Sequence, residues 1–185
     1  MNGRHYDPSI LLKCECSDAN WAALKTYIAD WAKTHEGQKE DPRPTLISLV
    51  VQKDGEQTFV HNAIFTPFNT GPEKDATLGT IAQKHVDMEL VPMALAFTSA
   101  VWISQRRDVQ PEDDPKRREA IIIALARLRT HPVSRECEMW NYPVTRDAEG
   151  KAHLGELDKP IGGVPVILDR FYRFYFERLA RRFKL

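Results

Sequence analysis

The densest run of chemically active side chains lies at residues 104–118, SQRRDVQPEDDPKRR. Within it, Asp114-Pro115-Lys116 fits the acid-x-lysine element that many metal-dependent nucleases place at the end of a strand. The central proline removes a backbone donor and bends the chain, which favours a solvated loop over a metal site. Because the loop is longer than a hairpin needs, and long loops are often functional, we predict a contact surface. Its candidate binding residues are Arg106, Arg107, Asp113, Asp114, Arg117 and Arg118.

Two further groups of side chains could do acid-base chemistry. His85 and Glu89 lie four residues apart in a predicted helix, so they could share one face as an acid-base pair or as metal ligands. Glu136 and Glu138 alternate on a predicted strand, where paired carboxylates could serve a glycosidase. No third ligand accompanies His85, and neighbours on an exposed hairpin face are the default interpretation of the two glutamates. The catalytic residues of any enzyme therefore stay unassigned.

Cys14 and Cys16 could offer two thiolates to zinc. They are separated by one residue, whereas zinc pairs usually have about two to four between them, and no second pair follows. Buried positions on a strand are the favoured interpretation. The chain also lacks the P-loop, GxSxG, HExxH and GxGxxG motifs. The sequence thus predicts neither a metal nor a cofactor.

The C-terminal stretch, residues 165–184, is the strongest local signal. At about 100° per residue its apolar side chains fall in one wide arc: Leu168, Phe171, Tyr172, Phe174, Tyr175, Phe176, Leu179 and Phe183. A basic ridge gathers opposite: Arg170, Arg173, Arg181 and Lys184. The favoured interpretation is a helix packed on a sheet with a solvated basic side. The alternatives are a nucleic-acid ridge, a membrane-surface helix or a homodimer face, and the width of the arc favours dimerisation among them.

Composition limits the class of protein. The chain has 185 residues, 42% apolar and 28% charged, which predicts one globular domain over residues 1–185. Lys plus Arg equals Asp plus Glu, 26 each, so no global field recruits nucleic acid or an anionic membrane. Three cysteines suggest free thiols in a reducing cytosol, and the first residues do not resemble a secretory signal. We therefore expect a cytoplasmic protein with no membrane partner.

The elements that must position these residues follow from periodicity and from capping and turn signals. Ser17 or Asp18 can cap the first helix, and residues 119–129 could be a helix but favour a strand because of their three isoleucines. The expected elements are a strand at 10–16, a helix from 18 to about 37, a hairpin over 45–65, a helix over 72–90, strands at 93–104 and 119–129, a hairpin over 134–157, and a helix over 165–184. This order predicts an α+β fold with a mainly antiparallel sheet of five to seven strands, two helices and the C-terminal helix packed on it.

Residues 93–123 also carry a local pattern. Trp102 and Ser104 end a predicted strand, and Pro111, Asp114-Pro115 and residues 117–121 (RREAI) follow. This pattern resembles that of uncharacterised small proteins of bacteria and phages, over about a sixth of the chain, although those proteins have a Glu-Ala pair before the tryptophan. The resemblance implies a strand after Glu119 and no catalytic residue.

These observations predict a binding or accessory protein that acts through protein–protein contact, using the loop and the C-terminal helix. The partner could be another protein or a second copy of the chain. One rival is a nucleic-acid-associated protein that uses the basic ridge. A second rival is a small hydrolase with a histidine or carboxylate site near His85 or Glu136.

Overall fold

A seven-stranded antiparallel sheet forms the middle layer of the protein, with strand order β2-β1-β3-β4-β5-β6 and β7 paired with β5. The computed structural model describes residues 15–52, 55–66, 68–104, 108, 110, 113–130, 133–161 and 165–183. The strands are β1 (Thr45–Val51), β2 (Gln57–Ala63), β3 (Val91–Ile103), β4 (Arg118–Thr130), β5 (Val133–Arg146), β6 (Ala152–Leu154) and β7 (Asp158–Ile161). The helices are α2 (Asp18–Lys33), α3 (Gly71–Asp87) and α4 (Val166–Phe183). The predicted α+β fold is confirmed.

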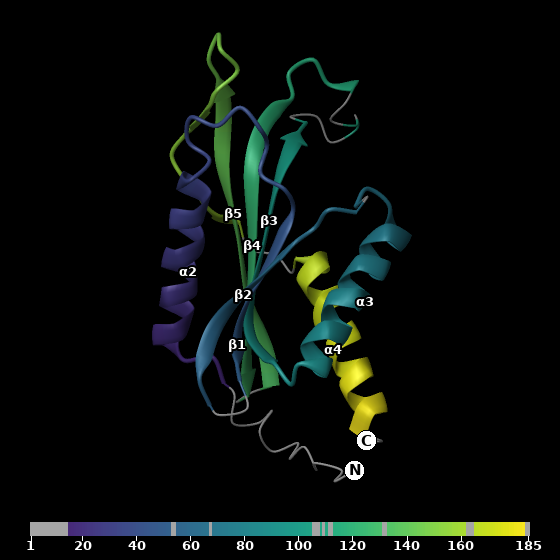
Figure 1. Cartoon of the computed structure of the whole chain (residues 1–185). Coiled ribbons are helices and arrows are strands. Elements are labelled where there is room, and N and C mark those ends of the chain that lie inside the picture. The colour runs from purple at the N-terminus through teal and green to yellow at the C-terminus, as the bar shows by residue number, and fades with distance from the viewer. Residues whose placement is uncertain are drawn as a thin grey trace.

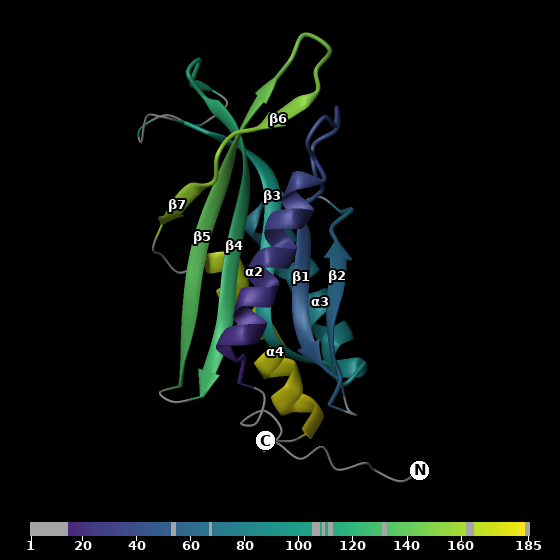
Figure 2. The same cartoon turned by 90° about the vertical axis from the view of Figure 1, so that its left-hand side faces the viewer.

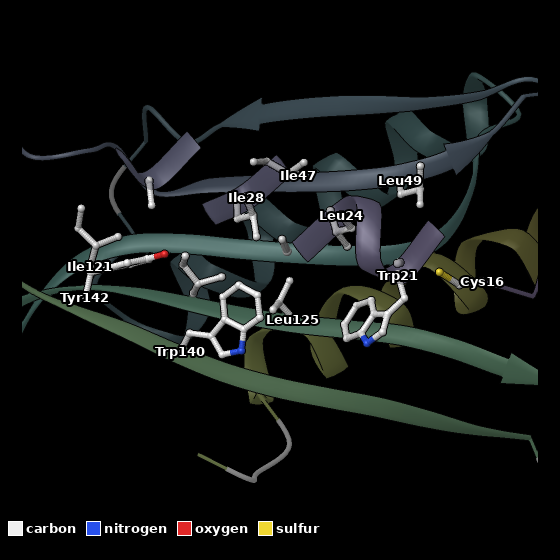
Figure 3. Close-up of a cluster of buried hydrophobic side chains, with 14 of the residues drawn as sticks. Cys16, Trp21, Leu24, Ile28, Ile47, Leu49, Ile121, Leu125, Trp140 and Tyr142 are labelled. Atoms are coloured by element: carbon white, nitrogen blue, oxygen red, sulfur yellow. The ribbon is translucent and has the colours of Figure 1, made fainter. Parts of the chain in front are cut away.

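Helix α2 covers one face of the sheet, as Figures 1 and 2 show. Its first turn is capped by Ser17, whose hydroxyl accepts a hydrogen bond from the Asn20 N–H at 3.1 Å. The apolar side of α2 is buried against residues of β1, β3, β4 and β5. Figure 3 shows this cluster, in which Trp21, Leu24 and Ile28 of α2 face the sheet.

Helices α3 and α4 cover the opposite face (Figure 1). A capping box begins α3, since Thr70 and Glu73 each accept from the other's backbone N–H. The predicted apolar arc of α4 packs on the sheet and on α3. Five of its eight members are buried, namely Leu168, Phe171, Tyr172, Tyr175 and Leu179.

Strands β3 and β4 are covered by helices on both faces, which accounts for the apolar residues on both faces of each strand. Leu95 and Phe97 of β3 belong to the core under α3 and α4, whereas Ala94 and Ala96 belong to the core under α2. β3 is therefore the two-sided central strand that its apolar alternation predicts. Residues 118–130 form strand β4 rather than a helix, because β-branched isoleucines pack well on a sheet flanked by helices on both faces.

Two parts of the chain differ from the expected order of elements. No element is expected between residue 157 and the C-terminal helix at 165, yet Asp158–Ile161 pairs with β5 as β7. Pro160 argues against a strand in the sequence, because proline cannot donate to the ladder of hydrogen bonds, but proline is tolerated at the edge of a sheet. The strand predicted at residues 10–16 lies mostly outside the described residues, and Glu15 and Cys16 belong to no strand. Cys16 is nevertheless buried, in the core under α2.

Candidate binding surface at the strand ends

The long strands extend past the helices that cover them. β3 has 13 residues and spans about 43 Å, whereas α2 has 16 residues and spans about 24 Å. The end of β3 and the start of β4 therefore project beyond all three helices (Figure 1). At this end Trp102 is 49% exposed and Ile103 is 39% exposed. The apolar residues on both faces of β3 suggest a strand that is covered throughout, whereas the comparison of strand length with helix length accounts for the exposure of Trp102.

Arg117 lies against Trp102. Its guanidinium carbon is 4.8 Å from the centroid of the indole ring, a cation–π contact worth about 0.5–1 kcal/mol at an exposed site. Arg118 is the register partner of Ile103 across β3 and β4. We name five exposed residues at this end the strand-end surface: Trp102, Ile103, Asp113, Arg117 and Arg118. Trp102 with Arg117 lies on one face of the strand pair, and Ile103 with Arg118 lies on the other.

Asp114 joins the end of β3 to the segment that leads into β4. It is only 2% exposed, and its carboxylate accepts hydrogen bonds from the Ser104 hydroxyl at 2.6 Å and from the Lys116 N–H at 2.8 Å. The Arg117 N–H donates to the Asp114 carbonyl at 3.0 Å. This predicted contact residue thus lies too deep to touch a partner, and it anchors the segment that carries Arg117. The acid-x-lysine element is an ordinary side-chain-capped turn.

The other predicted loop residues separate into two groups. Asp113, Arg117 and Arg118 are exposed and belong to the strand-end surface. Arg106 and Arg107 lie outside the described residues. Three of the six candidate residues are therefore brought together at one end of the sheet.

A buried ion pair supports the strand-end surface from below. Glu119, the register partner of Trp102, is 8% exposed and accepts from Arg146 at 2.9 and 2.5 Å. Arg146 also donates to the carbonyls of Lys39 and Gly150, and it pairs with Asp41. Burial and the neighbouring Glu119 raise the pKa of Asp41. One arginine thus fixes the α2–β1 connection and the β5–β6 turn to the start of β4.

The basic ridge of α4 is partly used in contacts within the chain. Arg170 pairs with Asp75 of α3 at 2.9 Å. Arg173 is exposed, with its guanidinium 4.9 Å from the Phe174 ring, and Arg181 is exposed as well. Lys184 lies outside the described residues. The pairing of Arg170 reduces the positive charge left for a phosphate backbone.

His85 occupies a packing position. It is 1% exposed, with Nδ1 2.9 Å from the Ile81 carbonyl oxygen and Nε2 3.1 Å from the Ser48 hydroxyl. Burial lowers the pKa of His85, which favours the neutral ring. Glu89 follows the end of α3 in a left-handed conformation, with φ of 56°, and is not on a helical face with His85.

Glu136 is held by a buried arginine that the sequence analysis missed. Arg127 of β4 is 4% exposed, and its guanidinium lies 2.6 Å from both Glu136 and Asp18. The hydrogen bond from Arg127 lowers the pKa of Glu136. Glu138 bonds instead to Lys25 and to the indole N–H of Trp140, each through a separate oxygen. A short connection between the strands predicted at 119–129 and from 134 would place Arg127 opposite Glu136, as the β4–β5 register does, so the pair could have been found by aligning the two strands.

The described residues contain no group of three or more His, Cys, Asp or Glu side chains arranged to hold a metal ion. Burial raises the pKa of Cys16 to about 11, so its thiol stays protonated near neutral pH. Cys14 lies outside the described residues. Among the described residues, no helix combines the length and the hydropathy that a membrane crossing requires.

Comparison of the chain with protein-family models, with curated proteins and with solved structures gives no match.

Proposed function

We propose that this chain is a binding protein that acts through contact with another protein, and that the strand-end surface is its contact site. The observation that carries this proposal is the exposed Trp102 with Arg117 stacked on it. Tryptophan and arginine are the residues most enriched among those that dominate the energy of protein interfaces. An exposed aromatic at the end of a strand has no role in the core, whereas it suits the centre of an interface.

The site is also preorganised. Asp114 links the segment that carries Arg117 to Ser104 at the end of β3, and Arg146 links the α2–β1 connection to Glu119, the register partner of Trp102. Side chains that are already held in place lose less conformational freedom on binding. The Trp–Arg pair on one face of the strand end, with Ile103 and Arg118 on the other, offers a partner that encloses this end an aromatic, an apolar and two cationic side chains.

Site-specific cross-linking tests the proposal in cells of the source organism. A photo-reactive aromatic residue is placed at position 103, which follows Trp102 in the chain at the same strand end, and the adducts formed on irradiation are identified by mass spectrometry. We expect one dominant protein adduct, and its mass distinguishes a different protein from a second copy of this chain. The matched control carries the same residue at position 88, where Met88 is 59% exposed at the far end of α3.

The Trp102→Ala change in the position-103 variant should abolish the adduct without altering the melting temperature by more than a few degrees. Equal adducts from positions 103 and 88, or an adduct that persists without Trp102, would contradict the proposal.

A further inference from the structure

A groove lies on the α3/α4 face of the sheet. It is lined in part by the residues at the starts of α3 and α4, which lie toward the same end of the sheet (Figure 1). Its volume is about 870 Å³, within the range of about 300–1,000 Å³ that is usual for small-molecule sites. Three strands form its floor, with Val101 on β3, Ile122 on β4 and Met139 on β5. The groove exists because the strands continue past α3 and α4, which leaves apolar sheet uncovered next to the helix ends.

The walls of the groove are apolar on two sides. Phe68, just before α3, and Phe97 of β3 form one side, with ring centroids 5.8 Å apart. Val166 and Ile167, in the first turn of α4, form another, and Val166 is 64% exposed. A ligand that fills this space would remove Val101, Ile122 and Val166 from water, so its body must be apolar.

The acidic side chains at the groove have hydrogen-bonding or ion-pair partners, whereas the lysine at the groove makes no ion pair with any described residue. Asp41 lines the groove, but its carboxylate pairs with Arg146. Glu73 lines the adjoining end of α3, but its carboxylate accepts from the Asn69 and Thr70 N–H groups at 2.9 Å. Lys74 also lines the groove, and within the described part of the chain it makes no ion pair, its ammonium lying 5.9 Å from the Phe68 ring.

A second donor accompanies this lysine. Asn69 also lines the groove, and its side-chain amide makes no hydrogen bond to any residue that the structure describes. The capping box already satisfies much of the helix terminus, so the donors available to a ligand are the side chains of Lys74 and Asn69. An uncompensated ammonium and an amide at the edge of an apolar groove complement an apolar molecule with one anionic end.

We infer that the groove is a ligand site for a small amphipathic carboxylate, whose alkyl or aryl body lies on Val101, Ile122 and Met139 and whose carboxylate lies at Lys74 and Asn69. This site is separate from the protein contact proposed above. The apolar body supplies most of the affinity, and the carboxylate sets the orientation of the ligand and its preference over neutral or cationic analogues.

Titration calorimetry with octanoate, decanoate and dodecanoate, each below its micelle concentration, tests the apolar part of the site. Each added methylene that is buried should tighten Kd by about fourfold, the equivalent of about 0.8 kcal/mol. Decanol and decylamine test the anionic part. Decanoate should bind more tightly than decanol, and decylamine should bind most weakly, because the Lys74 ammonium attracts a carboxylate and repels a second ammonium. The preference for decanoate over decanol should be only about threefold to tenfold, because Lys74 is partly exposed and solvent screens its charge.

Two variants separate the contributions. Lys74→Met keeps the alkyl stem over Phe68, so it should equalise decanoate and decanol while preserving the dependence on chain length. Val101→Trp fills the groove and should weaken decanoate at least tenfold, whereas Met88→Trp, at the opposite end of α3, should leave Kd unchanged. Thermal melts establish that each variant is folded. A Kd that does not respond to chain length, or decylamine binding as tightly as decanoate, would overturn the inference, as would unchanged binding by a folded Val101→Trp protein.

Discussion

Removing the carboxylate of Asp114 should destabilise the protein because this buried group joins Ser104, after β3, to Lys116, before β4. In Asp114→Ala, the Ser104 hydroxyl and the Lys116 N–H lose the acceptors that lie 2.6 and 2.8 Å away. A buried donor left without a partner costs about 1–3 kcal/mol. Ser104 is only partly buried, so we expect values near the lower end of this range and a total of about 2–3 kcal/mol.

Urea denaturation followed by tryptophan fluorescence and circular dichroism measures this loss directly. For a chain of this length, about 1 kcal/mol corresponds to about 2–4 °C, so the melting temperature should fall by about 4–12 °C. The matched control is Asp114→Asn. Its oxygen can still accept from the Lys116 N–H, and its amide can donate to the Ser104 hydroxyl, so the loss should stay below about 1 kcal/mol.

Two results would contradict this role of Asp114. If the free energy of unfolding of Asp114→Ala is within about 0.5 kcal/mol of the wild-type value, these two hydrogen bonds do not stabilise the protein. If the asparagine variant loses as much as the alanine variant, the negative charge matters rather than the hydrogen-bond geometry. Hydrogen exchange adds a local measure, since the Lys116 amide should exchange faster in Asp114→Ala and nearly unchanged in Asp114→Asn.

Three further predictions follow from buried or paired groups. Arg146→Met leaves the carboxylate of Glu119, which is 8% exposed, without its arginine, and urea denaturation should show a loss of about 2–4 kcal/mol in the free energy of unfolding. The loss should be smaller than for a fully buried pair because Arg146 is 28% exposed. Adding Glu119→Met should recover part of the loss, and strictly additive losses would contradict the pairing. Cys16, whose pKa burial raises to about 11, should react slowly with a thiol reagent in the native protein and rapidly in urea, and rapid native labelling would show that it is accessible. The hydrogen bonds from His153 to Glu36 and Asp147 raise the pKa of His153. The wild type should therefore melt above His153→Gln by the full amount below about pH 6.5, and this difference should fade as the pH rises through the raised pKa. A difference in melting temperature that does not depend on pH would contradict this prediction.

Local patterns in the sequence were sufficient to predict most of the elements. The alternation of β3, the isoleucines of β4 and the wide arc of α4 each depend on side chains that pack directly on a sheet. The turn at residues 147–151 was equally readable, because Gly150 adopts the positive φ, 80°, that glycine permits. These features are local, so neighbouring residues carry enough information.

The candidate site was harder to predict because its geometry depends on contacts between distant segments. Arg127 meets Asp18 across more than one hundred residues of chain, and Arg146 joins Lys39 to Glu119. The burial of Asp114 requires Ser104 on the opposite side of the loop, a pairing that the loop sequence does not specify. The exposure of Trp102 follows only when strand and helix lengths are compared in three dimensions. Spacing alone could place the charged loop at the end of the strands, but it could not separate the anchor from the contact residues.

The affinity of the cross-linked partner for the purified protein shows whether Trp102 is the centre of the contact site. Titration calorimetry would compare the wild type with Trp102→Ala and with Phe65→Ala. Phe65 is a matched control because it is 73% exposed and has the Arg43 guanidinium 4.5 Å from its ring, but lies outside the strand-end surface. We expect Trp102→Ala to weaken Kd at least thirtyfold, which is about 2 kcal/mol, and Phe65→Ala to leave Kd unchanged. Equal affinity of the wild type and the folded Trp102→Ala protein would rule out the strand-end surface as the contact site.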